Sequence, residues 1–399
     1  MGKVKKLLSA LAQVPIYVLV SLLNRDPKIW IFSSWHGKKY SDNPRYLYEY
    51  CQSYEKNIKS IWLAKNKETV ATLRSQGFNA YHTYSPLGIL YQIKAGVCIF
   101  SHGSTTEFIP AFMNKKIKKI QLWHGSPIKK IRNDDNLEKK PTYIQKKILE
   151  LLFPWRKERF DLIPSPSNTV KNTLASAFLS DNVYVCGYPR NDKLVPSLPK
   201  SGPILIKKVL YAPTFRGTFL TKESSESTSN LLLKSGFIPA EIDKTLQSIG
   251  LELILRLHPS NMPSEKLKSQ IKETKNIKFD ITDDIYESLN DYDILITDYS
   301  SIYLDFLLTG KPIINLAFDL DEYLTYSREM YYNYNEVAIT KNIETWSSAL
   351  SFIEDLLTYG PSEKYIKNYI HIRKKFNEIE DSHSSQRTSK LIHSLLLTD

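Results

Sequence analysis

The stretch ILITDYSS, residues 294–301, begins with four apolar or β-branched residues and ends in a polar turn. Its first half predicts a buried strand, and a helix is expected to follow from Ile302 to Leu308. The first turn of a helix leaves backbone N–H groups without intrahelical partners, and the helix dipole adds partial positive charge there. With the hydroxyls of Ser300 and Ser301, this strand–turn–helix predicts a site for a phosphate or diphosphate.

Similar strand–loop–helix units recur along the chain. In the first half, apolar runs predict strands at 29–34, 59–64, 97–101 and 117–123. In the second half they predict strands at 209–211, 251–257, 277–280, 294–297 and 312–316. Short strands that alternate with helices predict parallel sheets covered on both faces, with ligands bound at the carboxyl ends of the strands.

At 399 residues the chain is long enough for two α/β domains. We expect a membrane-associating segment at 1–28, a Rossmann-like domain at 29–195 and a second one at 204–376. A Pro- and Ser-rich linker at 196–203 joins the two. A C-terminal helix is expected within 377–399, and in such chains this helix often crosses back. A helix at 284–290 and a mobile loop at 222–230 complete the expectations for the second domain.

The net charge of +12 is unevenly distributed. Residues 1–200 contain 32 Lys and Arg against 14 Asp and Glu, so all the excess positive charge lies in the first half. This favours a polyanionic partner, such as an anionic membrane surface, a phosphate-rich polymer or nucleic acid, over a merely solvated basic surface. The three cysteines, which lie far apart, indicate free thiols in a reducing compartment.

The N-terminus combines three lysines with a mostly apolar stretch at 7–23 that contains Pro15. No small-residue cleavage site follows it, which argues against a signal peptide. The stretch is shorter than a spanning helix needs, so we favour a basic, apolar segment that lies on the inner face of a membrane. A first helix packed on the domain is almost equally well supported, and a transmembrane helix ranks third.

His124 directly follows a predicted strand and precedes Gly125, whose missing side chain lets a ligand approach the backbone. A neutral imidazole at this place can take a proton from an acceptor hydroxyl. The alternative is a histidine that only hydrogen-bonds a neighbouring loop. His36 and His102 also follow strands, so one of the three histidines is a candidate for a structural role.

His258 follows another strand and can donate a hydrogen bond to a diphosphate oxygen, although it can equally cap the edge of the sheet. Thr214 and Arg216 suit hydrogen bonding and charge pairing to phosphate. Arg256 alternates within an apolar strand, and we expect it to be structural.

Several other chemistries find little support. Cys and His spacings do not fit zinc, and the Asp pairs stand at helix starts, so no metal site is expected. Walker and GxGxxG motifs are absent from the sequence. The lysine-rich run at 115–119 lacks the aromatic pattern of an RNA-binding sheet, so nucleic acid is an unlikely partner.

Five ordered motifs together resemble the CDP-glycerol glycerophosphotransferase family, which contains teichoic-acid primases and polymerases. They are WHGSPIKK at 123–130, GYPRND at 187–192, YAPTFR at 211–216, LRLHP at 255–259 and ITDYSS at 296–301. The resemblance implies a GT-B-like α/β fold, in which two Rossmann-like domains face each other across a cleft. It also implies an acceptor-binding first domain, a nucleotide-binding second domain, no metal or other cofactor, and peripheral attachment to the cytoplasmic face of the membrane.

The resemblance also assigns roles to residues. His124 matches the general base, and His258 matches a histidine that contacts the donor diphosphate. The remaining donor-binding positions are Thr214, Arg216, Ser300, Ser301, Asp319, Arg328 and Asn333. The acceptor-binding positions are Gly125, Lys129 and Lys130.

One departure from the family pattern concerns the donor. Asn333 stands where the family has an acid near the polyol. An amide can donate as well as accept hydrogen bonds, so the donor polyol is left open between glycerol and ribitol.

The sequence therefore predicts transfer of a polyol phosphate from a CDP-polyol to a hydroxyl of a lipid-linked, phosphate-rich acceptor, with release of CMP. A glycosyltransferase of the same fold that uses a nucleotide sugar is the alternative, and a non-enzymatic polyanion-binding protein is a distant third. The number of units added, and the choice between wall polymer and capsule, are left open.

Overall fold

The computed structural model describes residues 3–137, 140–216, 232–258, 261–326, 329–341 and 343–397. The chain forms two compact units. Unit 1 consists of residues 1–124, 138–192 and 383–399, and unit 2 consists of residues 125–137 and 193–382. The loop expected at 222–230, Pro259 of the LRLHP motif and Arg328 lie outside the described residues.

Unit 1 is built on a parallel sheet whose strand order is β3-β2-β1-β4-β5, and a further parallel pair, β6-β7, adjoins β5 through a bridge between Ile120 and Leu162. The strands are β1 Asp26–Phe32, β2 Lys59–Ala64, β3 Ala80–His82, β4 Ala95–Phe100, β5 Lys118–Gln121, β6 Ile163–Ser165 and β7 Val183–Val185. The helices are α1 Lys3–Leu22, α2 Asp42–Tyr54, α3 Lys67–Ser75, α4 Pro86–Lys94, α5 Ser104–Glu107, α6 Tyr143–Leu152, α7 Asn168–Phe178 and α16 Ser384–Leu397.

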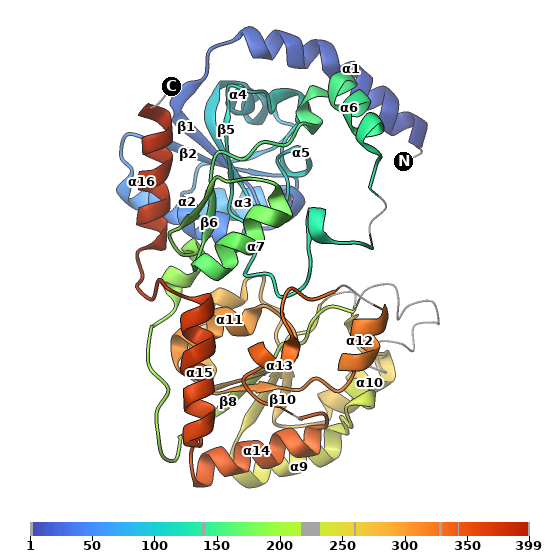
Figure 1. The fold of residues 1–399 in the computed structure, drawn as a ribbon, viewed down its shortest axis with the longest axis vertical. Coiled ribbons are helices and arrows are strands. Elements are labelled where there is room, and N and C mark those ends of the chain that lie inside the picture. The colour runs from blue at the N-terminus through green and yellow to red at the C-terminus, as the bar shows by residue number, and fades with distance from the viewer. Residues whose placement is uncertain are drawn as a thin grey trace. The chain divides into compact units, whose positions relative to one another are not determined.

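The last helix, α16, completes the core of unit 1, where it lies against α2 (Figure 1). Ile392 of α16 is fully buried in the same apolar cluster as Trp30 and Trp62. The start of the helix is fixed by Asp192, whose carboxylate oxygens accept hydrogen bonds from the backbone N–H groups of Ser384 and Ser385, each at 2.7 Å. The GYPRND motif therefore contributes to holding the C-terminal helix on this unit.

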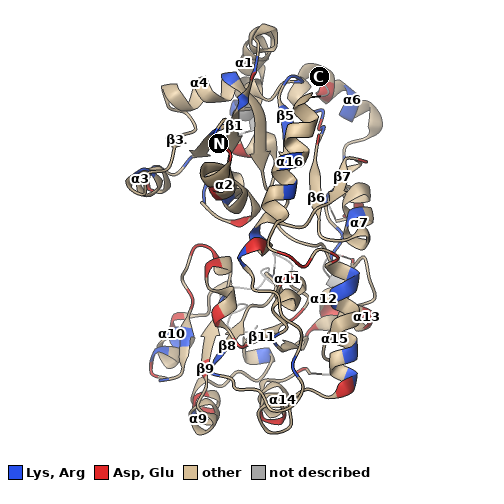
Figure 2. Ribbon diagram, turned by 90° about the vertical axis from the view of Figure 1, so that its left-hand side faces the viewer, with Lys and Arg blue, Asp and Glu red and all other residues tan. Residues whose placement is uncertain are grey.

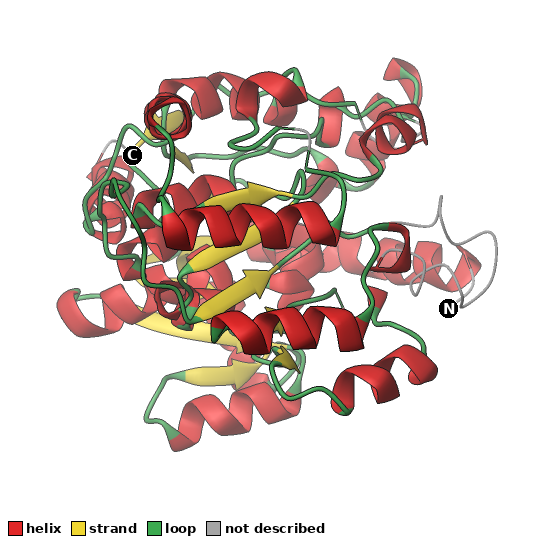
Figure 3. Ribbon diagram, turned by 90° about the horizontal axis from the view of Figure 1, so that it is seen from below, coloured by secondary structure: helices red, strands yellow, loops and turns green. Residues whose placement is uncertain are grey.

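Unit 2 repeats the plan with the strand order β10-β9-β8-β11-β12, again parallel throughout. Helices flank these strands in Figure 3. The strands are β8 Lys208–Tyr211, β9 Glu252–Leu255, β10 Ile277–Phe279, β11 Ile294–Thr297 and β12 Ile313–Asn315. The helices are α9 Pro239–Ile249, α10 Glu265–Lys272, α11 Ile302–Phe306, α12 Leu320–Tyr326, α13 Tyr334–Val337, α14 Trp346–Thr358 and α15 Glu363–Phe376.

Both sheets therefore run outward in both directions from their first strand, β1 in unit 1 and β8 in unit 2. In open α/β sheets the chain switches sides at such a point, and the loops on either side diverge to leave a crevice at the carboxyl ends of the strands, where ligands bind. The expectation of two Rossmann-like domains in an α/β protein is confirmed.

Three local expectations need correction. The helix expected at 284–290 is instead a pair of 3₁₀ turns, Ile285–Glu287 and Leu289–Asp291, which still bury Ile285 and Leu289. Strand β3 was not predicted, because three residues are too short to show a pattern. The helix expected at 302–308 is α11 followed by a 3₁₀ turn at Leu307–Thr309.

Helix α1 packs on unit 1 through one face and exposes the other. Tyr17 and Val20 are buried, and the Gln13 side chain accepts a hydrogen bond from the backbone N–H of Ala111. Among the described residues, none of the helices combines the length and the apolar character that crossing a membrane requires.

Candidate functional site

Three histidines cluster in unit 1 at the switch point of its sheet. His36 follows β1, His102 follows β4 and His124 follows β5, and these three strands are neighbours. The ring centroids of His36 and His102 are 4.5 Å apart, and those of His102 and His124 are also 4.5 Å apart. These three histidines, which follow separate strands in the sequence, thus form one group in unit 1.

His124, the predicted general base, lies half-buried at the end of this row. Its Nδ1 is 3.5 Å from the carbonyl oxygen of Ser101. A neutral imidazole that donates from Nδ1 to this carbonyl carries its lone pair on Nε2, which is the atom that would accept a proton. The geometry therefore suits a base, provided that Nε2 faces the substrate.

His102 lies between the other two histidines, and its backbone is hydrogen-bonded to the Glu107 side chain. A carboxylate oxygen of Glu107 accepts a hydrogen bond of 2.8 Å from the backbone N–H of His102, and the Ser101 hydroxyl lies 2.9 Å from His102 Nδ1. Burial, together with the neighbouring His124 and His36, lowers the pKa of His102 to about 2. Complete burial raises the pKa of Glu107 to about 8, against hydrogen bonds that lower it. At neutral pH, His102 is thus neutral and Glu107 mostly protonated.

The backbone beside these histidines adopts a conformation that bulky residues rarely take. Trp35 and His36 have φ values of 48° and 58°, and Trp123, just before His124, has a φ of 53°. Non-glycine residues in this left-handed region are uncommon and are concentrated at functional sites, where the surrounding structure maintains the strain. The strained positions coincide with two of the three histidine-bearing loops.

In unit 2, the ends of β8 and β11 meet at a buried ion-pair network around Arg216. The guanidinium group lies 2.8 Å from an Asp298 oxygen, and its Nε and Nη2 donate to the two carboxylate oxygens of Asp319 at 2.9 and 2.8 Å. The Tyr299 hydroxyl donates to Asp319 as well, at 2.7 Å. In the sequence, Asp298 was only a position of the ITDYSS motif and Asp319 was predicted to bind the donor, and the network that joins both to Arg216 was not foreseen.

This network changes what Arg216 can do. All its side-chain nitrogens face protein oxygens, since Nη1 also donates to the Thr214 carbonyl at 2.8 Å, and the side chain is 2% exposed. Direct contact of Arg216 or Asp319 with a diphosphate would require these ion pairs to rearrange. In the structure, Arg216 and Asp319 hold the two loops together, and their donor-binding role stays a prediction.

The serine pair is positioned by the same network. Asp298 accepts hydrogen bonds from the backbone N–H groups of Ser300, at 3.0 Å, and of Thr214, at 2.9 Å. Ser300 and Ser301 are half-buried, and within the described part of the chain their hydroxyls bond to no other residue. The ligand-binding role of the two hydroxyls stays a prediction, and Thr214, which is assigned to the same ligand, is buried.

Two other predicted donor residues, His258 and Asn333, are both exposed but have different neighbours. His258 is exposed after β9, and its ring lies 4.4 Å from that of Phe215. Asn333 is also exposed, and its side-chain oxygen caps α13 by accepting a hydrogen bond from the Asn335 N–H at 3.1 Å. Arg256 pairs with Asp280, which agrees with the structural role expected for it.

The two lysines assigned to the acceptor belong to unit 2, as does Gly125, which has a φ of 131°. Lys129 Nζ is 3.4 Å from Thr214 Oγ1. It also lies 6.0 Å from the centroid of the Tyr299 ring and 5.9 Å from that of the Tyr323 ring. Lys130 forms an ion pair with Glu329. Lys129 thus lies beside Thr214, a predicted donor residue, and the assignment of both lysines to the acceptor stays a prediction.

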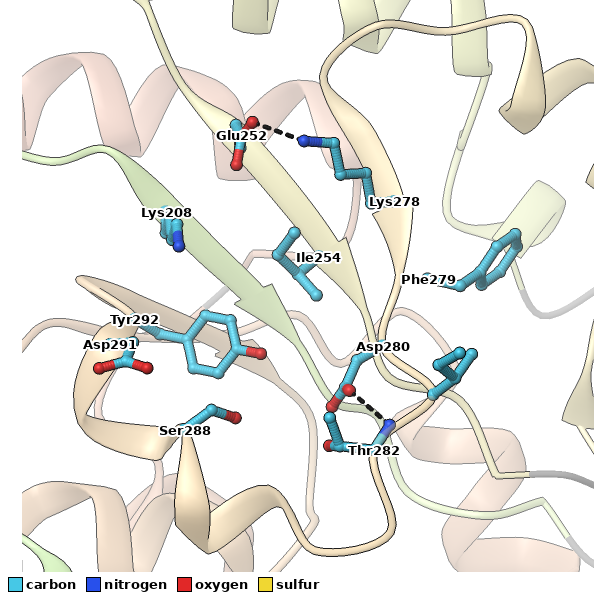
Figure 4. A pocket seen from close by; sticks show the side chains of 11 residues that line it. Lys208, Glu252, Ile254, Lys278, Phe279, Asp280, Thr282, Ser288, Asp291 and Tyr292 are labelled. Carbon is cyan, nitrogen blue, oxygen red and sulfur yellow. Dashed lines mark hydrogen bonds and ion pairs between the residues drawn. The ribbon is translucent and has the colours of Figure 1, made fainter.

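Two hollows in unit 2 differ in their relation to these residues. One, of about 340 Å³, is lined by Asp319 and by polar side chains such as Asn315, Asn335 and Lys341. The other, of about 370 Å³, lies on the face of strands β8, β9 and β10, beside the ion pair of Glu252 with Lys278 (Figure 4). None of the predicted site residues lines the second hollow. In the part of the chain that the structure describes, no cluster of His, Cys, Asp or Glu could hold a metal ion.

Comparison with known proteins extends over nearly the whole chain. A model of the CDP-glycerol:poly(glycerophosphate) glycerophosphotransferase family matches residues 16–394. A teichoic acid poly(glycerol phosphate) polymerase of Staphylococcus epidermidis is 28% identical over 78% of this chain, which spans 43% of that relative. A teichoic acid glycerol-phosphate transferase of Staphylococcus aureus is 27% identical over 98% of this chain and 99% of its own length.

A solved structure of the wall teichoic acid polymerase TagF, soaked with CDPG, is also similar. It is 25% identical, covers 99% of this chain and 98% of its own, and has a TM-score of 0.71. The structural likeness confirms the expected GT-B-like fold.

Proposed function

Because the chain belongs to the CDP-glycerol:poly(glycerophosphate) glycerophosphotransferase family, we propose that it transfers a polyol phosphate from a CDP-polyol to a hydroxyl group of a lipid-linked acceptor. The observation that carries the proposal is that each sheet has the same strand order and bears its own set of chemical groups at the switch point. Unit 1 supplies the histidine row, and unit 2 supplies the serine pair.

In this mechanism His124 removes the proton of the acceptor hydroxyl. The acceptor oxygen attacks the β-phosphorus of the CDP-polyol and forms a new phosphodiester bond, while the bond between that phosphorus and the bridging oxygen breaks. CMP leaves with the bridging oxygen. Hydrogen bonds from Ser300, Ser301 and His258 would offset the negative charge that develops on the diphosphate.

The proposal allows either glycerol or ribitol as the polyol of the donor. Asn333 supports this, because its side-chain oxygen is occupied by the helix cap and its Nδ2 group remains a donor that is not shared with any described residue. A hydrogen-bond donor at this place would suit a hydroxyl group of either polyol, the shorter glycerol or the longer ribitol.

The test is CMP release from CDP-glycerol and from CDP-ribitol, measured with a lipid-linked acceptor that ends in a polyol phosphate. The wild type should turn over at least one donor, and His124→Ala should reduce the rate at least about a hundredfold, as expected for loss of a general base. No CMP release from either donor, or full activity of His124→Ala, would refute the proposal.

The acceptor is lipid-linked in this proposal, and we infer that a surface of unit 1 lies on the membrane. Helices α1 and α6 lie beside each other in Figure 1, and a ring contact of 5.8 Å between Tyr17 and Trp155 joins α1 to the turn that follows α6. Both helices expose large apolar side chains to an unusual degree: Leu8 60%, Leu19 64%, Leu22 74%, Ile144 70% and Leu151 81%. Helix α6 also carries Lys146 and Lys147, and Figure 2 shows basic residues on this helix.

Apolar side chains and lysines on one amphipathic surface suit an interface with anionic lipids. We expect the full chain to sediment with vesicles that contain anionic lipid, and Leu19→Glu combined with Leu151→Glu to abolish this. Phosphatidylcholine vesicles should bind more weakly. Equal binding of the double variant to anionic vesicles would contradict the inference, and Tyr54→Glu, an equally exposed residue of α2, serves as the control.

A further inference from the structure

Several exposed or half-buried groups beside His102 and His124 have no task in the sequence motifs or in the proposed reaction, and two of them are lysines. Three of them lie after β1 or β2, at the same ends of the strands as His124: His36, Lys38 and Lys65. His36 and Lys38 are exposed, and Lys65 is half-buried. The proposed base has therefore a positively charged neighbourhood within its own unit.

Lys65 and His36 are fixed by a shared neighbour, Thr106 of α5. Lys65 Nζ donates to the Thr106 carbonyl at 2.6 Å, and His36 Nδ1 lies 3.3 Å from the Thr106 hydroxyl oxygen. The Thr106 hydroxyl donates its own proton to the Gly103 carbonyl at 3.0 Å, so it accepts from His36. Among the described residues, the Thr106 carbonyl oxygen is the one hydrogen-bond acceptor of the Lys65 ammonium group, which leaves two of its three protons for a ligand.

The backbone of Gly37 allows this arrangement. A Cβ atom at Gly37 would lie only 3.1 to 3.3 Å from the side-chain carbons of Lys65, and its φ of 81° also favours glycine. The Lys65 N–H donates to the Gly37 carbonyl at 2.6 Å. The lysine stem is thus packed against the strained 3₁₀ turn Trp35–Gly37 that carries His36.

The nearby carboxyl group of Glu107 would not repel a bound anion. Glu107 lies beneath His102 with no exposed surface. Because burial raises its pKa to about 8, it is mostly uncharged at neutral pH. Conversely, burial and the charges of Lys38 and Lys65 lower the pKa of His36, and Lys65 itself has a lowered pKa because it is partly buried. An anion bound here would relieve this crowding of positive charge.

We propose that Lys65, with His36 and Lys38 beside it, binds a phosphodiester group of the acceptor, next to the hydroxyl that His124 activates. Ring contacts of 4.5 Å connect His36 to His102 and His102 to His124, so the subsite adjoins the base on the same unit. The inference rests on the proposed function for the identity of the acceptor. It gives unit 1 an acceptor contact of its own, in place of Lys129 and Lys130, which lie in unit 2.

The kinetic test compares Lys65→Ala with Lys56→Ala. Lys65 follows the carboxyl end of β2, whereas Lys56 is an exposed lysine that precedes the amino end of the same strand. At saturating CDP-polyol, Lys65→Ala should raise the KM for the acceptor about tenfold, as expected for loss of one charge-assisted hydrogen bond. The donor KM should not change. Lys65→Arg should keep the acceptor KM within about threefold of the wild type, because the charge is retained.

A second variant addresses His36 without straining the backbone. His36→Asn removes the imidazole but keeps a residue that tolerates the left-handed conformation, and it should also raise the acceptor KM. An unchanged acceptor KM in Lys65→Ala, or the same rise in Lys56→Ala, would overturn the subsite.

A binding measurement separates this inference from the proposed function. Titration calorimetry with glycerophosphoglycerol, a phosphodiester that carries no nucleotide, should show binding to the wild type and about tenfold weaker binding to Lys65→Ala. If the wild type releases no CMP from any CDP-polyol, the proposed function fails, yet this measurement still decides the subsite. Equal affinity of the two proteins, or no binding to the wild type, would refute it.

Discussion

The imidazole ring of His102 lies flat against that of His124, with centroids 4.5 Å apart and planes inclined by only 14°. On its other side, His102 is anchored through its backbone N–H to Glu107. A rigid, neutral ring therefore supports the residue that we propose as the base. Since a general base must hold its lone pair within hydrogen-bond reach of the substrate, this support should matter to the rate.

Removal of that ring gives the first prediction. His102→Ala should lower kcat about tenfold through loss of orientation, with little change in either KM. His102→Phe, which retains a flat ring of similar width, should recover most of the rate. The measurement is CMP release at saturating substrates. If His102→Phe is as slow as His102→Ala while both variants unfold at the same temperature, stacking is not what His102 contributes.

Glu107 leads to a prediction about stability and pH. Its folded-state pKa is raised to about 8 from an ordinary 4.5, so between these values the folded state retains a proton that the unfolded state has lost. The contribution of Glu107 to the free energy of unfolding therefore declines as pH rises from about 4.5 to about 8.

Glu107→Gln, which cannot ionise, should abolish this decline. Urea unfolding of both proteins at several pH values should show the variant gaining on the wild type as pH increases over that range. His102 does not confuse the comparison, because it titrates with a pKa of about 2 when folded and is present in both proteins. A constant difference between the two proteins at all pH values would contradict the assignment of a protonated Glu107.

Much of this arrangement could be read from the sequence, but only where the information is local. Strand β11 was predicted because four consecutive residues are apolar or β-branched. The serine pair was placed after its carboxyl end for the same local reason. Glu107 could not be identified, since a carboxyl group in a short polar stretch has the pattern of a surface residue. Only the packing of α5 in the fold buries it completely.

Arg216 illustrates the same limit from the opposite side. A positive charge in the loop that follows a strand predicts a phosphate ligand, and nothing local indicates a buried partner. Asp319 lies 103 residues further along the chain, and only the fold brings its carboxylate to the guanidinium group. Two acids that follow neighbouring strands could have suggested an ion pair of this kind. The distances from their carboxylates to the guanidinium group could not be predicted from the sequence.

The buried network yields a third prediction, which separates structural from functional groups in unit 2. Arg216→Ala leaves Asp298 and Asp319 without their counter-ion, and loss of one partner from a buried pair destabilises a protein by about 3–5 kcal/mol. Thermal or urea unfolding without ligand should reveal this loss. A change below about 1 kcal/mol would show that the network is not a main support of the unit.

The serine pair should behave in the opposite manner. Ser300→Ala and Ser301→Ala remove hydroxyls that bond to no other described residue, so each should alter the free energy of unfolding by less than about 0.5 kcal/mol. Each should raise the KM for the CDP-polyol about tenfold, because one hydrogen bond to a charged oxygen is lost. Normal donor KM values in both variants, measured by CMP release, would remove the pair from the donor site.

Lys129 provides the last prediction, which decides between donor and acceptor. The WHGSPIKK motif suggests an acceptor contact, because the lysine follows the proposed base by five residues. In unit 2, however, Lys129 Nζ lies 3.4 Å from Thr214 Oγ1 and close to the ring of Tyr299, whose neighbour in sequence is Ser300. We therefore expect Lys129→Ala to raise the donor KM about tenfold, with the acceptor KM unchanged. Lys130→Ala, which removes only the ion pair with an exposed Glu329, is the matched control and should change neither value. A rise in the acceptor KM alone would restore the assignment made from the motif.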